Sequence, residues 1–129
     1  MTAGRVDLYI EQGATYRRTW RWNTVSPDGL TLTPINLTGY IARMQIRRSQ
    51  GATASVSIST ESGGITLGGT AGTVSIVLTD DQTDVLQPKS AVYDLELEAP
   101  NGDVYRFIQG RITVDPNITQ ESDDPILTD

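Results

Sequence analysis

Apolar and polar side chains alternate along most of this chain with a repeat of two residues. The alternating runs occupy residues 5–10, 15–22, 40–48, 54–60, 73–78, 91–97 and 104–114. A repeat of two places one set of side chains on one face of a β-strand, whereas an α-helix requires a repeat near 3.6. Strands of this kind bury their apolar faces by stacking sheet against sheet. The pattern therefore predicts an all-β protein.

Turn residues separate these runs at short intervals. Segments 26–29 and 100–103 combine proline, a short polar residue and glycine, which favours tight turns. Parallel neighbours need crossovers of about a dozen residues or more, so short turns favour antiparallel pairing. The glycine-flanked segment 65–67 fits either a short strand or a wide turn. We predict an immunoglobulin-like antiparallel β-sandwich of about seven strands with one short helix.

The one segment that looks helical is 79–86. Thr79 followed by Gln82 three positions later fits a capping box. Asp80 and Asp81 would complement the helix dipole in the first turn, and Pro88 would end the helix after about two turns. We read these aspartates as helix-capping groups rather than calcium ligands, since the oxygen donors and glycine of a calcium loop are not present at the required spacing.

The chain of 129 residues fits a single domain. We assign residues 1–116 to the sandwich and residues 117–129 to an acidic C-terminal arm without periodicity. The predicted interior comprises the apolar residues on one face of each run, together with two aromatic residues of the second run. These are Tyr16, Trp20, Met44, Ile46, Val56, Ile76, Tyr93, Leu95, Ile108 and Ile112. Arg18 falls on the aromatic side of its run, where it either stacks on a tryptophan or lies at the rim.

Composition excludes several kinds of chemistry. The chain has no cysteine and no histidine, so disulfides, thiolate or imidazole metal sites and histidine-based catalytic triads are ruled out. No apolar run is long enough to span a membrane, and the net charge of −6 disfavours a nucleic-acid surface. Asp94, Glu96 and Glu98 share a strand face, which we interpret as solvated or interfacial rather than as a glycosidase pair. We expect no cofactor, no metal and no enzymatic activity.

Charge is distributed unevenly along the chain. Seven arginines lie between Arg5 and Arg48, whereas residues 115–129 contain five acids and no base. Candidate partner-binding residues are the outward arginines of two predicted strands and the apolar pair in the acidic arm: Arg17, Arg21, Arg43, Arg47, Ile126 and Leu127. Arginine is favoured at protein interfaces. We therefore predict a homo-oligomeric array in which the acidic arm lies on another subunit.

Five short motifs occur in a distinctive order. They are IEQGATY at 10–16, PINLTGYIARMQIR at 34–47, GTVSIVLT at 72–79, VYDLEL at 92–97 and GRITVDP at 110–116. The ordered set resembles the small virion domains of tailed bacteriophages that are similar to the N-terminal domain of the upper baseplate protein (BppU). In that family a Leu-Thr-Gly turn leads into a strand, and a Tyr-Asp-Leu-Glu strand pairs with a closing Gly-Arg-Val-Thr-Val strand. The resemblance covers about residues 7–116.

The resemblance implies a non-enzymatic structural subunit of a phage virion, most often a tail or baseplate adaptor or attachment domain. Its implied partners are other virion subunits, and its implied location is the virion after synthesis in the bacterial cytoplasm. The helical, receptor-facing extension of the upper baseplate protein has no counterpart in these residues, so a capsid or neck decoration role stays open. Tyr16, Trp20 and Trp22 on one strand face raise a further alternative, a carbohydrate-binding module.

Overall fold

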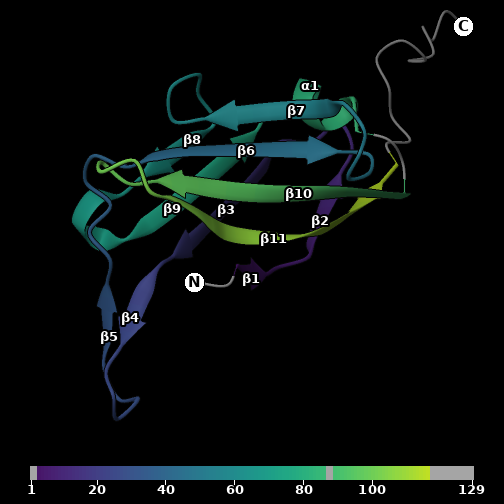
Figure 1. Ribbon diagram of the computed structural model, residues 1–129. Coiled ribbons are helices and arrows are strands. Elements are labelled where there is room, and N and C mark those ends of the chain that lie inside the picture. The colour runs from purple at the N-terminus through teal and green to yellow at the C-terminus, as the bar shows by residue number, and fades with distance from the viewer. Residues whose placement is uncertain (1–2, 87–88, 117–129) are drawn as a thin grey trace, which may run out of the picture.

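The computed structural model describes residues 3–86 and 89–116. Figure 1 shows two layers of strands with one short helix at an end. The strands are β1 (Gly4–Arg5), β2 (Leu8–Glu11), β3 (Tyr16–Arg21), β4 (Asn23–Val25), β5 (Leu32–Pro34), β6 (Ile41–Arg47), β7 (Ala54–Ser59), β8 (Ile65–Leu67), β9 (Thr73–Leu78), β10 (Lys89–Glu98) and β11 (Val104–Asp115). The helices are α1 (Asp80–Asp84) and a 3-10 turn at Gly69–Ala71.

Two sheets stack to form the body. The larger sheet has the order β1-β11-β10-β6-β7, with β2 also paired to β11, and the smaller sheet has the order β3-β9-β8. In Figure 1 the larger sheet lies in front of the smaller one. Strands β4 and β5 form a separate two-stranded ribbon. The prediction of an all-β sandwich with one short α-helix is confirmed.

The edge of the larger sheet departs from the predicted antiparallel pairing. Strands β1 and β2 both run parallel to β11, with Gly4 opposite Ile108 and Leu8 opposite Ile112. The requirement for a long crossover is met, because nearly the whole domain lies between β2 and β11 in the sequence. The sequence prediction of antiparallel pairing was wrong here because it considered only consecutive runs. The strand number also exceeds seven, since the first run is divided into β1 and β2 and three short strands are added.

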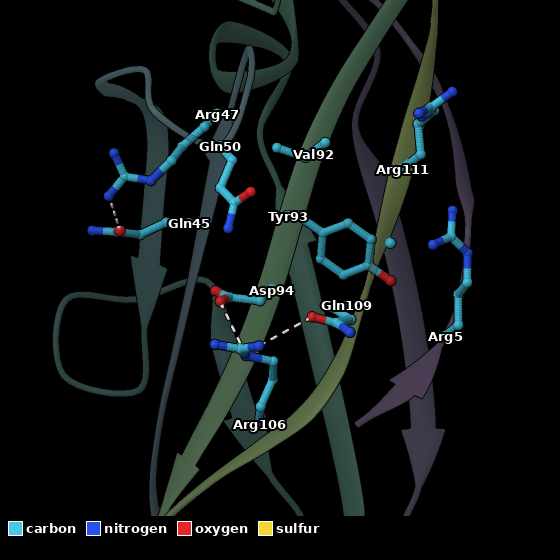
Figure 2. Close-up of a pocket in the computed structure, with 11 residues that line it drawn as sticks. Arg5, Gln45, Arg47, Gln50, Val92, Tyr93, Asp94, Arg106, Gln109 and Arg111 are labelled. Atoms are coloured by element: carbon cyan, nitrogen blue, oxygen red, sulfur yellow. Dashed lines mark hydrogen bonds and ion pairs between the residues drawn. The ribbon is translucent and has the colours of Figure 1, made fainter. Parts of the chain in front are cut away.

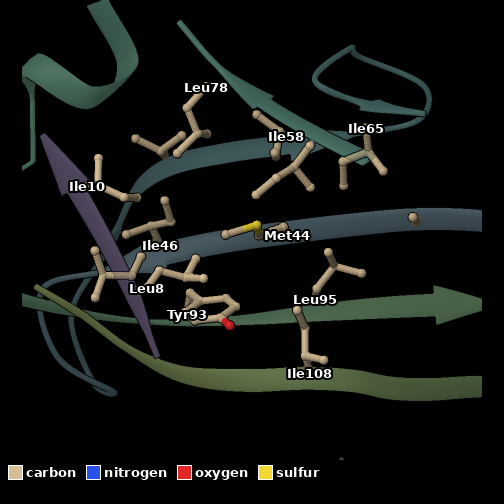
Figure 3. Close-up of a cluster of buried hydrophobic side chains, with 14 of the residues drawn as sticks. Leu8, Ile10, Met44, Ile46, Ile58, Ile65, Leu78, Tyr93, Leu95 and Ile108 are labelled. Atoms are coloured by element: carbon tan, nitrogen blue, oxygen red, sulfur yellow. The ribbon is translucent and has the colours of Figure 1, made fainter. Parts of the chain in front are cut away.

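The core lies between the two sheets and includes the inward residues of both (Figure 3). Eight of the ten predicted core residues are buried. Tyr16 and Trp20 are only half-buried and pack against the core from its margin. Both belong to β3, an edge strand of the smaller sheet, so one side of each ring has no neighbouring strand to cover it.

Local chemistry at the predicted turns and cap is confirmed. The backbone N–H of Gln82 donates to the Thr79 hydroxyl at 3.1 Å, and the Gln82 side chain accepts from the Thr79 N–H at 2.9 Å. Helix α1 is shorter than the predicted two turns, with its C-cap at Val85, and Pro88 lies outside the described residues. Segment 65–67 forms a strand rather than a wide turn.

The junction between β1 and β2 is built around a tyrosine and a glycine. Val6 lies in the gap between the two strands, and its carbonyl accepts a hydrogen bond from the buried Tyr93 hydroxyl. Gly110 lies opposite Tyr93 in the β10–β11 register. A Cβ atom at Gly110 would overlap the Val6 carbonyl oxygen, so the close approach requires glycine. Asp7 continues the pairing by accepting the Arg111 backbone N–H at 2.9 Å.

Candidate binding surfaces

The β4–β5 ribbon projects away from the sandwich (Figure 1). Its base is anchored by backbone hydrogen bonds from Trp22 N–H to Gly72 O and from Ile35 N–H to Trp22 O, both at 2.8 Å. The Trp22 ring packs at the base against Tyr105 and Phe107, with ring centroids 5.9 and 5.6 Å apart. The ribbon is therefore attached to the body through both backbone and aromatic contacts.

One face of this ribbon is apolar and open to solvent. Val25 lies directly opposite Leu32 in the register, so the two side chains share a face. Their exposed fractions are 60% and 62%, and Leu30 near the tip is 85% exposed. Thr24 and Thr33 form the next cross-strand pair and occupy the opposite face. The ribbon thus presents aliphatic side chains on one side and hydroxyl groups on the other.

The tip of the ribbon is held by its own hydrogen bonds. Gly29 N–H donates to Ser26 O at 2.8 Å with Gly29 at φ 75°, which confirms the turn predicted at 26–29. The Asp28 carboxylate accepts from the Ser26 hydroxyl and from the Leu30 N–H. These two bonds lower the pKa of Asp28, the Ser26 bond contributing most. A tip closed in this way holds Leu30 in a defined position.

A second candidate is a hollow of about 400 Å³ on the outer face of the larger sheet. Four arginines on three strands lie around it in Figure 2: Arg5 on β1, Arg47 on β6, and Arg106 and Arg111 on β11. Asp94 of β10 is the acidic residue in its lining. We call these residues the arginine hollow. Sequence alternation alone did not bring these four arginines together, because they come from strands distant in the sequence.

The charges of the arginine hollow are only partly compensated. Arg106 Nε lies 3.5 Å from Asp94 Oδ2, and Arg5 lies 3.4 Å from Asp7. Burial raises the pKa of Asp94 most, the charge of Glu96 adds to this, and Arg106 acts in the opposite direction. In the part of the chain that the structure describes, neither Arg47 nor Arg111 forms an ion pair with a carboxylate.

The predicted partner-binding arginines are on outward positions but not on one face. Arg17 and Arg21 lie exposed on β3 in the smaller sheet, whereas Arg43 and Arg47 lie on β6 in the larger sheet. Because the two strands belong to different layers, the four arginines do not form a single face. Ile126 and Leu127 lie outside the described residues. The partner-binding role of these side chains stays a prediction.

Arg43 is engaged within the molecule, along with two of the carboxylates noted in the sequence. Its guanidinium lies 3.3 Å from Glu96 Oε1 and 3.3 Å from Glu98 Oε1. Asp94 is paired with Arg106. The acidic face of β10 thus forms cross-strand ion pairs with β6 and β11, an arrangement that ties the strands of the larger sheet together.

The tryptophans are packed rather than aligned as an open platform. The Arg18 guanidinium lies 5.3 Å from the centre of the Trp20 ring, which confirms the stacking alternative for Arg18. Trp20 Nε1 is buried and has no hydrogen-bond partner among the described residues. Both tryptophans are half-buried against the core. The carbohydrate-binding alternative requires free ring faces, and on Trp20 one face is already covered.

Neither a known family nor a curated protein matches this chain. The resemblance to phage baseplate domains therefore stays a prediction. Within residues 3–86 and 89–116, no helix is long and apolar enough to cross a membrane. The same described residues contain no group of three or more acidic side chains placed to hold a metal ion.

The exposed apolar residues of the ribbon were missed in the sequence. Within residues 23–34 only the turn at 26–29 was predicted, and the aliphatic side chains beside it were not assigned to a surface. A signal was present, since Val25, Leu30 and Leu32 flank a strong turn in a stretch with few other apolar residues. Two strands of three residues each cannot bury such side chains between themselves.

Proposed function

We propose that this protein is a non-enzymatic structural subunit of a tailed-phage virion, placed in the tail or baseplate, and that the β4–β5 ribbon is its attachment element. The observation that carries the proposal is the projecting ribbon with Val25, Leu30 and Leu32 exposed on it. Exposed aliphatic groups gathered on one projecting element are characteristic of protein interaction sites. Attachment to a neighbouring subunit would remove them from water.

The energetics of the ribbon favour such a role. Full burial of an aliphatic side chain stabilises a complex by about 1.5–3 kcal/mol, and a few such residues supply most of the affinity of an interface. The hydrogen-bonded tip at Asp28 and the anchored base at Trp22 limit the conformational entropy lost on binding. A ribbon held at both ends is therefore a more effective anchor than a flexible loop of the same composition.

The motif order supports the placement in a phage particle. Three of the motifs that carry the resemblance fall on β6, β10 and β11, which are adjacent strands of the larger sheet. Tyr93 and Leu95 of the Tyr-Asp-Leu-Glu motif are buried in the core. The motif strands thus form a contiguous structural unit. A capsid or neck decoration role would use the same ribbon on a different neighbour.

The test is mass spectrometry and incorporation assays on purified phage particles assembled with this chain. We expect the protein in mature particles, and we expect the Leu30→Ser/Leu32→Ser variant to fold normally but to be incorporated at least tenfold less. Val85→Ser is the matched control, because Val85 is a similarly exposed aliphatic residue away from the ribbon, 55% exposed. Absence from mature particles would refute the virion assignment. Normal incorporation of the double variant would refute the role of the ribbon.

A further inference from the structure

We infer that the arginine hollow is the docking site for the acidic segment 117–129 of a second copy of this chain. This interface between two copies of the chain does not depend on the ribbon or on the type of particle. The arrangement of side chains on β6, β10 and β11 supports it.

Two arginines flank an apolar residue in the hollow. Val92 of β10 lies opposite Arg47 of β6 on one side and opposite Arg111 of β11 on the other. The three residues form one row across the sheet, and Figure 2 shows Arg47 and Arg111 on either side of Val92. The backbones of Arg47 and Arg111 are two strand spacings apart, a distance of about 10 Å. A row of this kind can hold two carboxylates above a small apolar surface.

The next row holds one of the arginines in place. Gln45, Asp94 and Gln109 lie opposite one another on β6, β10 and β11. Arg106 contacts both Asp94, at 3.5 Å, and Gln109 Oε1, at 3.3 Å. This row gives the hollow the one carboxylate among its described lining residues, and that carboxylate is already paired. The excess positive charge is concentrated on the row of Arg47 and Arg111.

Further contacts orient Arg47. It donates from Nη2 to Gln45 Oε1 at 2.6 Å and from Nη1 to the Ala52 carbonyl. Neutral acceptors fix the side chain without cancelling its charge. An arginine that is positioned in this way loses less conformational entropy when it binds a carboxylate, and its planar group donates two parallel hydrogen bonds to one carboxylate.

The sequence provides a complementary segment. Residues 117–129 contain four acids, Glu121, Asp123, Asp124 and Asp129, and no base. Glu121 and Asp124 are three residues apart in the sequence, and three residues of extended peptide span about 10 Å. This distance matches the separation between the backbones of the two arginine strands. Ile126 and Leu127 follow after Pro125 and can add apolar contact beside the charged pair. Charge sign and apolar content agree with the hollow.

The direction of β11 favours a second copy over the same molecule. Strand β11 passes through the hollow at Arg106–Arg111 and continues to Asp115. The strand therefore leads the chain away from its own hollow. Contact with its own hollow would require the chain to reverse direction after Asp115, whereas the hollow of a second copy imposes no such requirement.

The experiment measures self-association of the purified full-length chain by sedimentation equilibrium at low salt and at 0.5 M salt. We expect association that weakens at high salt, because exposed ion pairs are screened. The hollow variant Arg47→Glu/Arg111→Glu and the segment variant Glu121→Lys/Asp124→Lys should each weaken association at least tenfold. An equimolar mixture of the two variants should restore a complex, since the reversed charges are again opposite.

The matched control is Arg18→Glu/Arg48→Glu, which makes the same charge change at two exposed arginines outside the lining of the hollow. We expect this control to associate as the unsubstituted chain does. Circular dichroism checks that each variant is folded, and Arg111→Gln alone serves if the double reversal unfolds the sheet. The inference is overturned if the control weakens association equally, if the mixture does not restore the complex, or if the chain is monomeric at low salt. A monomer in which the segment variant alters the Arg111 side-chain NMR signals would assign the contact to the same molecule instead.

Discussion

Replacing Tyr93 by phenylalanine tests how the first strands are attached to the sheet. Tyr93 is 5% exposed, and its hydroxyl donates to the Val6 carbonyl in the gap between β1 and β2. The substitution keeps the ring and removes only the donor. The Val6 carbonyl is then left without this partner at a place where Gly110 brings it close to the sheet. An unsatisfied buried acceptor costs about 1–3 kcal/mol, so we expect the free energy of unfolding to fall by this amount.

Urea denaturation followed by tryptophan fluorescence measures this loss. With a urea m-value of about 1–3 kcal/mol/M, the expected loss lowers the midpoint by roughly 1 M without changing the slope. Tyr105→Phe is the control, because no hydrogen bond involves the Tyr105 hydroxyl in the part of the chain that the structure describes. A Tyr93→Phe variant as stable as the unsubstituted chain would refute the reasoning and place the β1–β2 junction elsewhere.

The raised pKa of Tyr93 also predicts that the stability of the fold depends on pH in the alkaline range. Burial is the largest cause that raises the pKa of Tyr93 above its ordinary value of 10.0. In the unfolded chain the phenol therefore loses its proton at lower pH than in the folded chain. The stability that this difference represents is present below pH 10 and is lost as the pH rises further. The Tyr93→Phe variant should therefore lose less of its free energy of unfolding between pH 8 and pH 11 than the unsubstituted chain does. Denaturation curves of both proteins at the two pH values would show this difference.

Three further substitutions test the core, the close approach and the helix cap. Leu95→Ala at a fully buried position, 0% exposed, should cost about 2–5 kcal/mol in urea denaturation, and a loss below about 1 kcal/mol would mean that β10 faces the other way. Gly110→Ala should lower the melting temperature strongly, whereas Gly51→Ala, with open space around it, should not; equal effects would contradict the overlap with Val6. Thr79→Ala should lose about 0.5–2 kcal/mol by removing the cap of α1, and an unchanged stability would show that the cap contributes nothing.

The sequence alone was sufficient for features that depend on a few neighbouring residues. Alternation identified the buried faces of β6, β9 and β10, because side-chain direction in a strand follows from the backbone repeat. The cap at Thr79 and the turn ending at Gly29 were predicted because their hydrogen bonds and backbone angles are local.

Tertiary structure decided which strands are neighbours, and both candidate surfaces depend on it. Nothing in the local pattern shows that β2 pairs parallel to β11, or that Arg17 and Arg43 belong to different sheets. Arg47 and Arg111 are separated by 64 positions in the sequence and share one row only because β6 and β11 both pair with β10. Pairing between distant segments is selected by burial over the whole core against the entropy of closing the intervening chain. That balance is a property of the complete fold, so no short stretch of sequence contains it.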